Sequence, residues 1–160
     1  MVLERIYVKP QSGADSQQRL RVDLVAGMGI EGDRYFGVAD EPSVNVTLIE
    51  AEAIEDFLRL HQLPFDLSIT GRNLVTRGVR LNAWVGREFH VGQVRLRGVE
   101  LADPCAVLGQ AVVQTFSTAA AAKGLMPSDV VRHFVQRGGL RAEVLFGGEI
   151  RVGDPLLEGF

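Results

Sequence analysis

Cysteine and lysine are scarce in this chain of 160 residues, which has one cysteine, Cys105, and two lysines, Lys9 and Lys123. A single cysteine excludes an internal disulfide and suits a reducing compartment, so we expect a cytoplasmic location. No apolar run is long enough to span a membrane, and the first residues lack the pattern of a signal peptide. The net charge of −3 gives no overall positive field, so we expect neither nucleic acid nor a membrane as a partner.

Two common functional templates are also missing from the sequence. There is no phosphate-binding loop ending in Gly-Lys-Ser/Thr, and no Gly-x-Gly-x-x-Gly motif follows a strand pattern. The three histidines, His61, His90 and His133, lie far apart, and with one cysteine they show none of the usual zinc-ligand spacings. We interpret each histidine as structural, although a catalytic Cys–His pair formed through space stays open.

The sequence does contain enough apolar residues, 46%, to build the core of one domain over residues 1–160. Short β-rich runs punctuated by glycine predict a closed or nearly closed β structure with helices beside it. The expected strands are residues 3–8, 20–25, 44–49, 74–76, 88–91, 94–101, 140–146 and 149–152, the last two forming a hairpin around Gly147 and Gly148. The expected helices are residues 50–61, 107–123 and 127–136, and a glycine-rich loop is expected over residues 27–41.

Four short strings carry the residues best suited to chemistry: Gly29–Arg34, Thr70–Arg77, Asp103–Cys105 and Arg137–Ala142. Glycine-flanked backbone N–H groups beside a guanidinium can bind an anion, and adjacent arginine and asparagine can grip phosphate or a heterocycle. The same arginines can instead pair with carboxylates. Pro104 stiffens the backbone before the cysteine, so the thiol is expected at a rigid strand end. A lone cysteine is, however, more often a small buried apolar residue.

Other residues of these strings are interpreted structurally. Asp33 is expected to orient Arg34 or to close its turn through an Asx-type hydrogen bond. Gly138 and Gly139 are expected to supply a positive φ.

Together and in this order, the strings resemble the MOSC domain, the module named after the C-terminal part of molybdenum-cofactor sulfurase. The resemblance extends from about residue 3 to about residue 157. Its motifs are Gly-Ile-Glu-Gly-Asp-Arg at 29–34, Val-Thr-Leu-Ile-Glu-Ala-Glu-Ala at 46–53, Gly-Arg-Asn-Leu-Val-Thr-Arg-Gly at 71–78, Leu-Asn-Ala-Trp-Val-Gly at 81–86, Pro-Cys at 104–105, Arg-Gly-Gly-Leu-Arg-Ala at 137–142 and Gly-Glu-Ile-Arg-Val-Gly-Asp at 148–154.

The resemblance implies an α+β fold, mainly β, in which a barrel like that of the pyruvate kinase barrel domain carries peripheral helices. It also implies the molybdenum cofactor, in which a pterin dithiolene holds the metal and carries a terminal phosphate. It nominates Cys105 as the catalytic residue and metal ligand, and Arg34, Thr47, Arg72 and Asn73 as cofactor contacts.

The implied activity is reduction of N-hydroxylated or N-oxygenated small molecules. Larger relatives carry additional domains that this sequence lacks, so the resemblance implies a separate electron-donor protein. The alternative is a sulfur carrier or sulfurtransferase that holds persulfide on Cys105, and a third possibility is a degenerate domain that only binds a pterin or phosphate. Many relatives have histidine after Gly-Asp-Arg, where this chain has Tyr35, which can hydrogen-bond but is not a cation at neutral pH.

Overall fold

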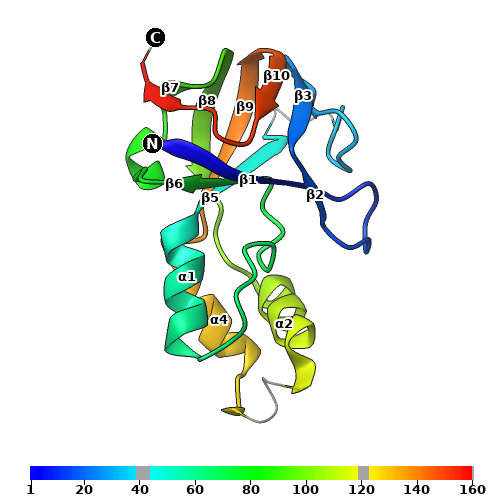
Figure 1. Cartoon of the computed structure of the whole chain (residues 1–160), viewed down its shortest axis with the longest axis vertical. Helices are drawn as coiled ribbons and strands as arrows, with labels where there is room; N and C mark the ends of the chain where they lie inside the picture. The colour runs from blue at the N-terminus through cyan, green and yellow to red at the C-terminus, as the bar shows by residue number, and fades with distance from the viewer. Residues whose placement is uncertain (39–43, 119–122, 160) are drawn as a thin grey trace.

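The computed structural model describes residues 1–38, 44–118 and 123–159, and its strands form two sheets (Figure 1). The eight-stranded sheet has the order β11-β7-β8-β9-β5-β6-β1-β2, and the three-stranded sheet has the order β10-β3-β4. The strands are β1 Val2–Val8, β2 Gln17–Arg19, β3 Arg21–Val25, β4 Gly29–Ile30, β5 Val46–Glu50, β6 Leu74–Arg77, β7 Glu88–Val91, β8 Val94–Leu101, β9 Leu140–Phe146, β10 Gly148–Arg151 and β11 Leu156–Glu158.

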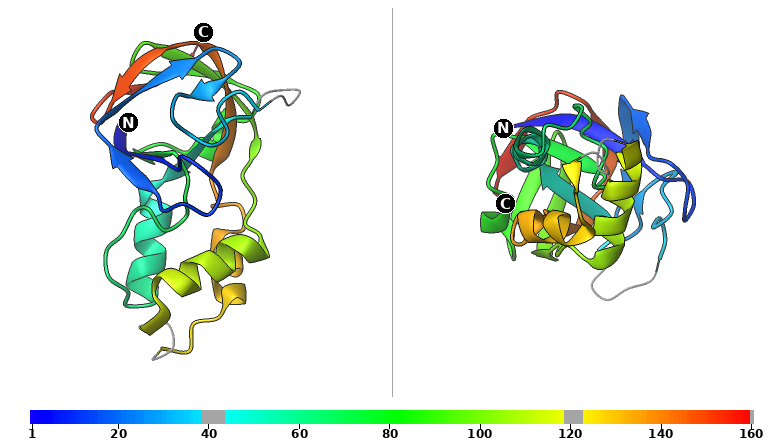
Figure 2. Two further views of the ribbon diagram at one scale, coloured as in Figure 1. Left: turned by 90° about the vertical axis from the view of Figure 1, so that its right-hand side faces the viewer. Right: turned by 90° about the horizontal axis from the view of Figure 1, so that it is seen from below.

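The larger sheet curls around one interior, and the helices lie at one end of it (Figure 2). The sheet comes close to closing where β1, which lies next to the edge strand β2, meets the segment that leads into β11. There the Leu3 amide donates to the Asp154 carbonyl at 2.9 Å, and the Gly153 amide donates to the Leu3 carbonyl at 2.7 Å. Only an isolated bridge between Val2 and Pro155 forms here, so the described strands do not make a closed barrel. The expected α+β class is confirmed, and the barrel is an open one.

The helices are α1 Ala51–Leu60, α2 Ala106–Thr115 and α4 Pro127–Phe134, with a 3-10 turn, η1, at Leu81–Trp84. Helix α1 agrees with the predicted helix 50–61, because its apolar residues recur on one face and are buried. The predicted helix 107–123 is confirmed in part, because the chain is helical up to Thr115, breaks at Phe116 and is helical again at residues 117–118 and 123. Helix α2 begins at Ala106 and ends at Thr115, whose hydroxyl donates to the Ala111 carbonyl, a bond that competes with the helical pattern. Residues 119–122 of that prediction lie outside the described residues.

Among the described residues, no helix combines the length and the apolar composition that crossing a bilayer requires.

The predicted hairpin of residues 140–146 and 149–152 is also wrong. Strand β10 pairs with β3 in the smaller sheet, not with β9. The chain changes sheets at Gly147, which packs so closely on β3 that a Cβ there would lie 2.3 Å from the Leu24 carbonyl oxygen. Glycine therefore permits a close crossing here instead of a hairpin turn. Strands β2, β4 and β11, each two or three residues long, were not expected from the sequence.

Two apolar cores share strands β5 and β6. Leu48 and Leu74 point into the core enclosed by the curled sheet. Their neighbours Ile49 and Val75 point the other way, into the core between the sheet and the helices. This alternation follows from the period of two in a strand, and it leaves both faces of these strands buried. The candidate site lies where β5 and β6 meet the loops around them.

Candidate functional site

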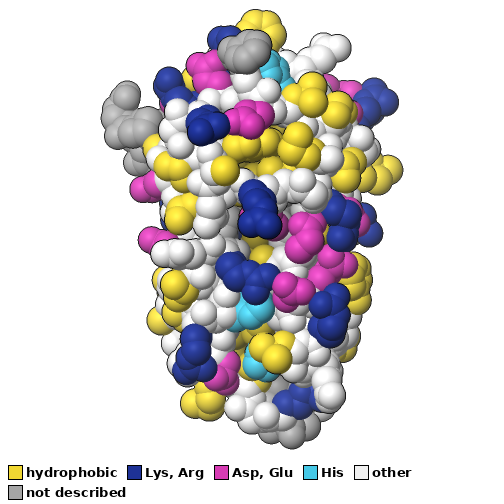
Figure 3. All heavy atoms as spheres, turned by 90° about the vertical axis from the view of Figure 1, so that its left-hand side faces the viewer, with side chains coloured by type: hydrophobic (Ala, Val, Ile, Leu, Met, Phe, Trp, Pro, Cys, Tyr) yellow, Lys and Arg dark blue, Asp and Glu magenta, His cyan; other side chains and the backbone are white. Residues whose placement is uncertain are grey.

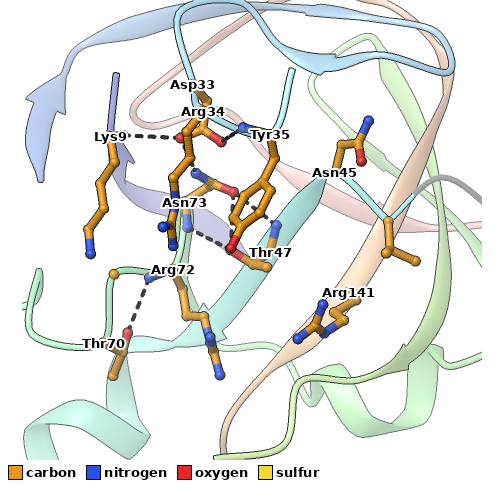
Figure 4. A pocket seen from close by; sticks show the side chains of 12 residues that line it. Lys9, Asp33, Arg34, Tyr35, Asn45, Thr47, Thr70, Arg72, Asn73 and Arg141 are labelled. Atoms are coloured by element: carbon orange, nitrogen blue, oxygen red, sulfur yellow. Dashed lines mark hydrogen bonds between the residues drawn. The ribbon is translucent and has the colours of Figure 1, made fainter. Parts of the chain in front are cut away.

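A pocket opens beside the ends of β1, β5, β6 and β9 and under the loop that follows β4 (Figure 4). It encloses about 120 Å³. Pockets that enclose a whole drug-sized ligand usually exceed about 300 Å³, so this one can enclose a single charged group of a larger molecule. The lining residues are Lys9, Asp33, Arg34, Tyr35, Val44, Asn45, Thr47, Thr70, Gly71, Arg72, Asn73 and Arg141.

Positive charge dominates this pocket. Lys9, Arg34, Arg72 and Arg141 come from four separate parts of the chain, and their side chains surround the cavity (Figure 4). Among the described residues, Arg141 is the one of these four with a carboxylate within ion-pair distance, Glu100 at 3.9 Å. Converging cations with little neutralisation are the arrangement expected of an anion-binding site.

Many cations elsewhere on the surface are paired, and the face in Figure 3 shows positive and negative side chains mixed together. Arg77 lies 2.7 Å from Glu4 and 2.9 Å from Glu55. Arg137 donates to Asp56 at 2.7 Å. Most arginines outside the pocket therefore have acidic partners, whereas Arg34 and Arg72 have none within ion-pair distance among the described residues.

The single carboxylate of the pocket wall, Asp33, is buried and faces the backbone. It accepts hydrogen bonds from the amides of Lys9 at 3.0 Å and Tyr35 at 3.2 Å. The second of these is the Asx-type turn predicted for Asp33, and the first ties the loop to the end of β1. The Arg34 amide also donates to the Lys9 carbonyl, at 2.8 Å. Asp33 thus fixes the loop that carries Arg34.

Arg34 and Tyr35 stack on each other at the mouth of the pocket. The Arg34 guanidinium carbon lies 4.5 Å from the centre of the Tyr35 ring, a cation–π contact. The Tyr35 side chain remains 44% exposed, so one face of the stack is open to solvent. Where the resemblance led us to expect histidine, this chain therefore has an aromatic ring that packs against a neighbouring guanidinium.

Arg72 joins the pocket to the segment that carries Cys105. Its Nε donates to the Gly138 carbonyl at 3.0 Å, and its Nη2 donates to the Ala102 carbonyl at 3.3 Å. A guanidinium has five N–H donors, so three remain for a ligand after these two bonds. Burial lowers the pKa of Arg72, and Arg141 lowers it further, while Cys105 acts in the opposite direction. Arg72 is therefore fixed in place before any ligand arrives, within electrostatic reach of the thiol.

Asn73 and Thr47 form the base of the pocket and bind each other. The amide nitrogen of the Asn73 side chain donates to the Tyr7 carbonyl at 3.1 Å and to Asp33 at 3.3 Å. Its oxygen accepts from the Thr47 backbone N–H and hydroxyl, both at 3.1 Å. The amide's hydrogen-bonding capacity is thus filled within the protein. Both residues line the site, and the geometry suits them to positioning the charged side chains around them.

Lys9 and Arg141 complete the site; Lys9 was not predicted, and Arg141 was noted in the string Arg137–Ala142 without being assigned a role. Lys9 directly follows β1, and Arg141 is the second residue of β9, opposite Thr47 across the strand pair. Arg137 and Arg141 flank the same glycine pair, but only Arg141 reaches the pocket.

The glycine pair before Arg141, Gly138 and Gly139, packs closely against neighbouring backbone. Gly139 has φ +101°, and a Cβ on it would lie 1.9 Å from the Leu48 carbonyl oxygen. Gly138 does not have the expected positive φ, but a Cβ on it would lie 2.2 Å from the Ala102 carbonyl oxygen.

Cys105 lies outside the pocket wall, at the start of α2. Strand β8 ends at Leu101, an extended segment follows, and Cys105 is the N-cap residue of the helix. Its thiol is exposed, which agrees with presentation at a strand end and not with a buried filler. A helix N-terminus favours a negative charge such as a thiolate. No group of three or more His, Cys, Asp or Glu side chains suited to a metal occurs in the described part of the chain.

The sequence matches a known family over most of its length. Residues 32–157 match the model of the MOSC domain. The chain belongs to the MOSC domain family. The resemblance predicted from the ordered motifs is thereby confirmed, and this MOSC domain places the matched Gly-Asp-Arg, Gly-Arg-Asn and Arg-Gly-Gly-Leu-Arg motifs around one pocket. No curated protein matches the chain.

Solved structures with the same fold include three bacterial proteins. YuaD of Bacillus subtilis has a TM-score of 0.83 at 18% identity, covering 99% of this chain and 96% of its own. YiiM of Geobacillus stearothermophilus has a TM-score of 0.65 at 14% identity. The match covers 99% of this chain and 75% of the YiiM chain. YiiM of Escherichia coli has a TM-score of 0.59 at 17% identity. The match covers 100% of this chain and 70% of the YiiM chain. At these identities the likeness shows the fold of the MOSC domain.

The donor set of the pocket suits the cofactor associated with this family. A terminal phosphate is the kind of group that three guanidiniums and an ammonium bind by charge-assisted hydrogen bonds. A thiolate is a soft ligand that suits a metal–sulfur centre. Lys9, Arg34, Arg72 and Arg141 would hold the phosphate, and Cys105 would supply the thiolate.

Proposed function

We propose that this MOSC domain binds the molybdenum cofactor and reduces N-hydroxylated or N-oxygenated small molecules. The observation that carries the proposal is the cavity surrounded by Lys9, Arg34, Arg72 and Arg141, whose one carboxylate, Asp33, faces the backbone. Such a cavity has a net positive charge and fixed donors before a ligand binds. It is therefore preorganised for a multiply charged anion, and a phosphate-bearing cofactor is the anion that the family association indicates.

The residues divide into two roles in this proposal. Arg34, Arg72 and Arg141 donate to the anionic group, and Lys9 adds a fourth positive charge. Asn73, with Thr47 and Asp33, positions them through buried hydrogen bonds. These bonds keep the donors aimed at one point without rearrangement on binding.

The bound cofactor would supply the two-electron redox chemistry. The overall conversion consumes one N-hydroxylated molecule, two electrons and two protons, and it yields the amine and water. The chain has one cysteine, too few for an iron–sulfur cluster held by four cysteines. We therefore propose that a separate electron-donor protein supplies the electrons. The roles of this chain are to hold the cofactor and to fix the orientation of the thiolate.

A second candidate function rests on the exposure of Cys105. We propose as the alternative that the thiolate takes a sulfane sulfur from a persulfide donor and passes it to a cofactor or partner protein. Transfer to the cysteine, or onward to a thiolate of a partner protein, breaks one S–S bond and forms another. Transfer to a cofactor as sulfide breaks the S–S bond and consumes two electrons, which a thiol reductant supplies. In each case the Cys105 thiolate is regenerated when the sulfur leaves. An exposed thiol at a helix N-terminus can reach a second macromolecule, which a thiol enclosed in a pocket cannot do.

The deciding experiment measures molybdenum per chain by elemental analysis, in protein from a host that makes the cofactor and is supplied with molybdate. We expect near-stoichiometric molybdenum in the wild type and much less in Cys105→Ala and Arg141→Ala. Arg137→Ala is the matched control, because Arg137 flanks the same glycine pair but lies outside the pocket. Its molybdenum content should equal that of the wild type.

Two further readouts separate the candidates. A loaded protein given reduced electron donor should convert an N-hydroxylated substrate to its amine, and Cys105→Ser should not. A mass increase of one sulfur atom on Cys105, removed by a thiol reductant, would favour sulfur transfer instead. Folded protein with cofactor available but neither molybdenum nor persulfide would refute both candidates and leave a binding domain.

A further inference from the structure

Lys9 is the one lysine of the pocket, and its surroundings differ from those of an ordinary surface lysine. It follows β1 directly, and its side chain is partly buried along the cavity wall (Figure 4). The ammonium nitrogen lies against Gly71, where a Cβ would be 3.0 Å away and where φ is +67°. Glycine at this position therefore leaves room for the lysine. Within the described ranges, no carboxylate lies within ion-pair distance of Lys9 Nζ. Asp33, the carboxylate of the pocket wall, accepts a hydrogen bond from the Lys9 backbone amide and not from its side chain.

The charges that face Lys9 favour its neutral, nucleophilic form. Burial lowers the pKa of Lys9, and the positive charges of Arg34 and Arg72 lower it further. Asp33 and Asp15 act in the opposite direction, and the net effect is still a lowered pKa. A lysine that is desolvated beside other cations is the usual environment of an amine that reacts with carbonyl compounds.

We propose that Lys9 forms a reversible imine with aldehydes that carry a phosphate or carboxylate group. In this step the Lys9 nitrogen attacks the carbonyl carbon, a C=N bond replaces the C=O bond, and the oxygen leaves as water with both nitrogen-bound protons. No oxidant, reductant or metal is needed. Arg34, Arg72 and Arg141 hold the anionic group and so place the aldehyde beside the amine.

This inference goes beyond the proposed reductase, because it depends on the pocket and not on a bound cofactor. An imine on Lys9 would occupy the cavity in which we place the cofactor phosphate. The adduct would therefore block that site, and phosphate in the cavity would in turn protect the lysine. Both effects can be measured on protein that contains no molybdenum.

The test uses pyridoxal 5′-phosphate on the full chain, followed by borohydride reduction and peptide mapping. Lys123 is an internal control, because it is the only other lysine, is exposed and lies outside the pocket. We expect Lys9 to be labelled about tenfold faster than Lys123, since the bound phosphate raises the local aldehyde concentration. Pyridoxal, which lacks the phosphate, should lose this preference, and inorganic phosphate should protect Lys9 but not Lys123.

Variants supply a second line of test. Lys9→Arg should abolish the pocket adduct, Arg141→Ala should slow labelling of Lys9, and Arg137→Ala should leave it unchanged. Equal labelling of Lys9 and Lys123 in the wild type, or labelling of Lys9 by pyridoxal as fast as by its phosphate, would overturn the proposal. The ratio is measured within one wild-type molecule, so it decides the matter even if a variant fails to fold. Molybdenum loading is a separate measurement, and its failure leaves this result intact.

Discussion

Replacing Asn73 with alanine should destabilise the protein more than any other asparagine substitution in the chain. The side chain is 4% exposed and takes part in four hydrogen bonds, two as donor and two as acceptor. Its partners are Tyr7, Asp33 and Thr47, which belong to β1, the Arg34 loop and β5. One amide therefore joins three segments that are far apart in the sequence.

The expected magnitude follows from what alanine leaves behind. A buried polar group without a partner costs about 1–3 kcal/mol, and Asn73→Ala strands several of them where water has little access. Allowing for partial relaxation, we expect a loss of about 3–5 kcal/mol. This is a large part of the total, since a domain of this size is stable by about 5–15 kcal/mol.

The assay is equilibrium urea unfolding of wild type, Asn73→Ala and Asn82→Ala. Asn82 is the matched control, because it is exposed and donates a single bond to the Gln136 carbonyl at 2.8 Å. We expect the Asn73→Ala midpoint to fall by about 2 M and the control to change by less than about 0.5 M. If both variants shift equally with unchanged slopes, the buried network does not stabilise the fold as argued. Titration of the folded variants with inorganic phosphate should also show weaker binding for Asn73→Ala.

Three further predictions concern stability, acidity and charge. Gly139→Ala should cost more than about 3 kcal/mol in urea unfolding, because the added Cβ meets the Leu48 carbonyl and the φ is positive; a near-neutral result would contradict the close packing. Arg77 holds the pKa of Glu4 below its usual value, so Glu4 contributes stability above its unfolded pKa that is lost as pH falls through the folded pKa. Glu4→Gln should therefore lower the free energy of unfolding at pH 7 by under about 1 kcal/mol for this partly exposed pair, and urea unfolding at low pH should show no difference from the wild type. Arg141→Ala should weaken binding of inorganic phosphate about tenfold in calorimetry, whereas Arg137→Ala should not.

Regular elements with a clear local pattern were predictable from the sequence. The alternation of residues 20–25 predicted β3, and the apolar face of residues 50–61 predicted α1. The pairing of β10 was not predictable, because its partner is β3, more than a hundred residues earlier, and not its chain neighbour β9. A strand of two or three residues carries too little pattern of its own. Its pairing depends on tertiary neighbours that composition does not reveal.

The site was partly predictable, for a related reason. Arg34, Thr47, Arg72 and Asn73 were nominated by motif, and the structure brings all four to one pocket. Lys9 gave no local signal, and Arg141 stood in the string Arg137–Ala142 without a role, because the register that places it opposite Thr47 is set by tertiary pairing. The motifs also could not show that the Asn73 amide is occupied within the protein. Cys105 lies outside the wall of the pocket. Arg72 connects the pocket to the segment that carries Cys105, because it donates to the Ala102 carbonyl.

The two apolar cores that share β5 and β6 have a consequence for how the molecule unfolds. Ile49 and Val75 pack against the helices, so removing the helices would expose them to solvent. The opposite faces of the same two strands contribute Leu48 and Leu74 to the core enclosed by the sheet. Partial opening of the helical end would thus weaken the floor of the pocket as well, since Thr47 and Asn73 belong to or adjoin the same two strands. The helical end and the sheet should therefore lose structure in a single cooperative transition. The amides of β5 and β6 should be the slowest in the chain to exchange with deuterium.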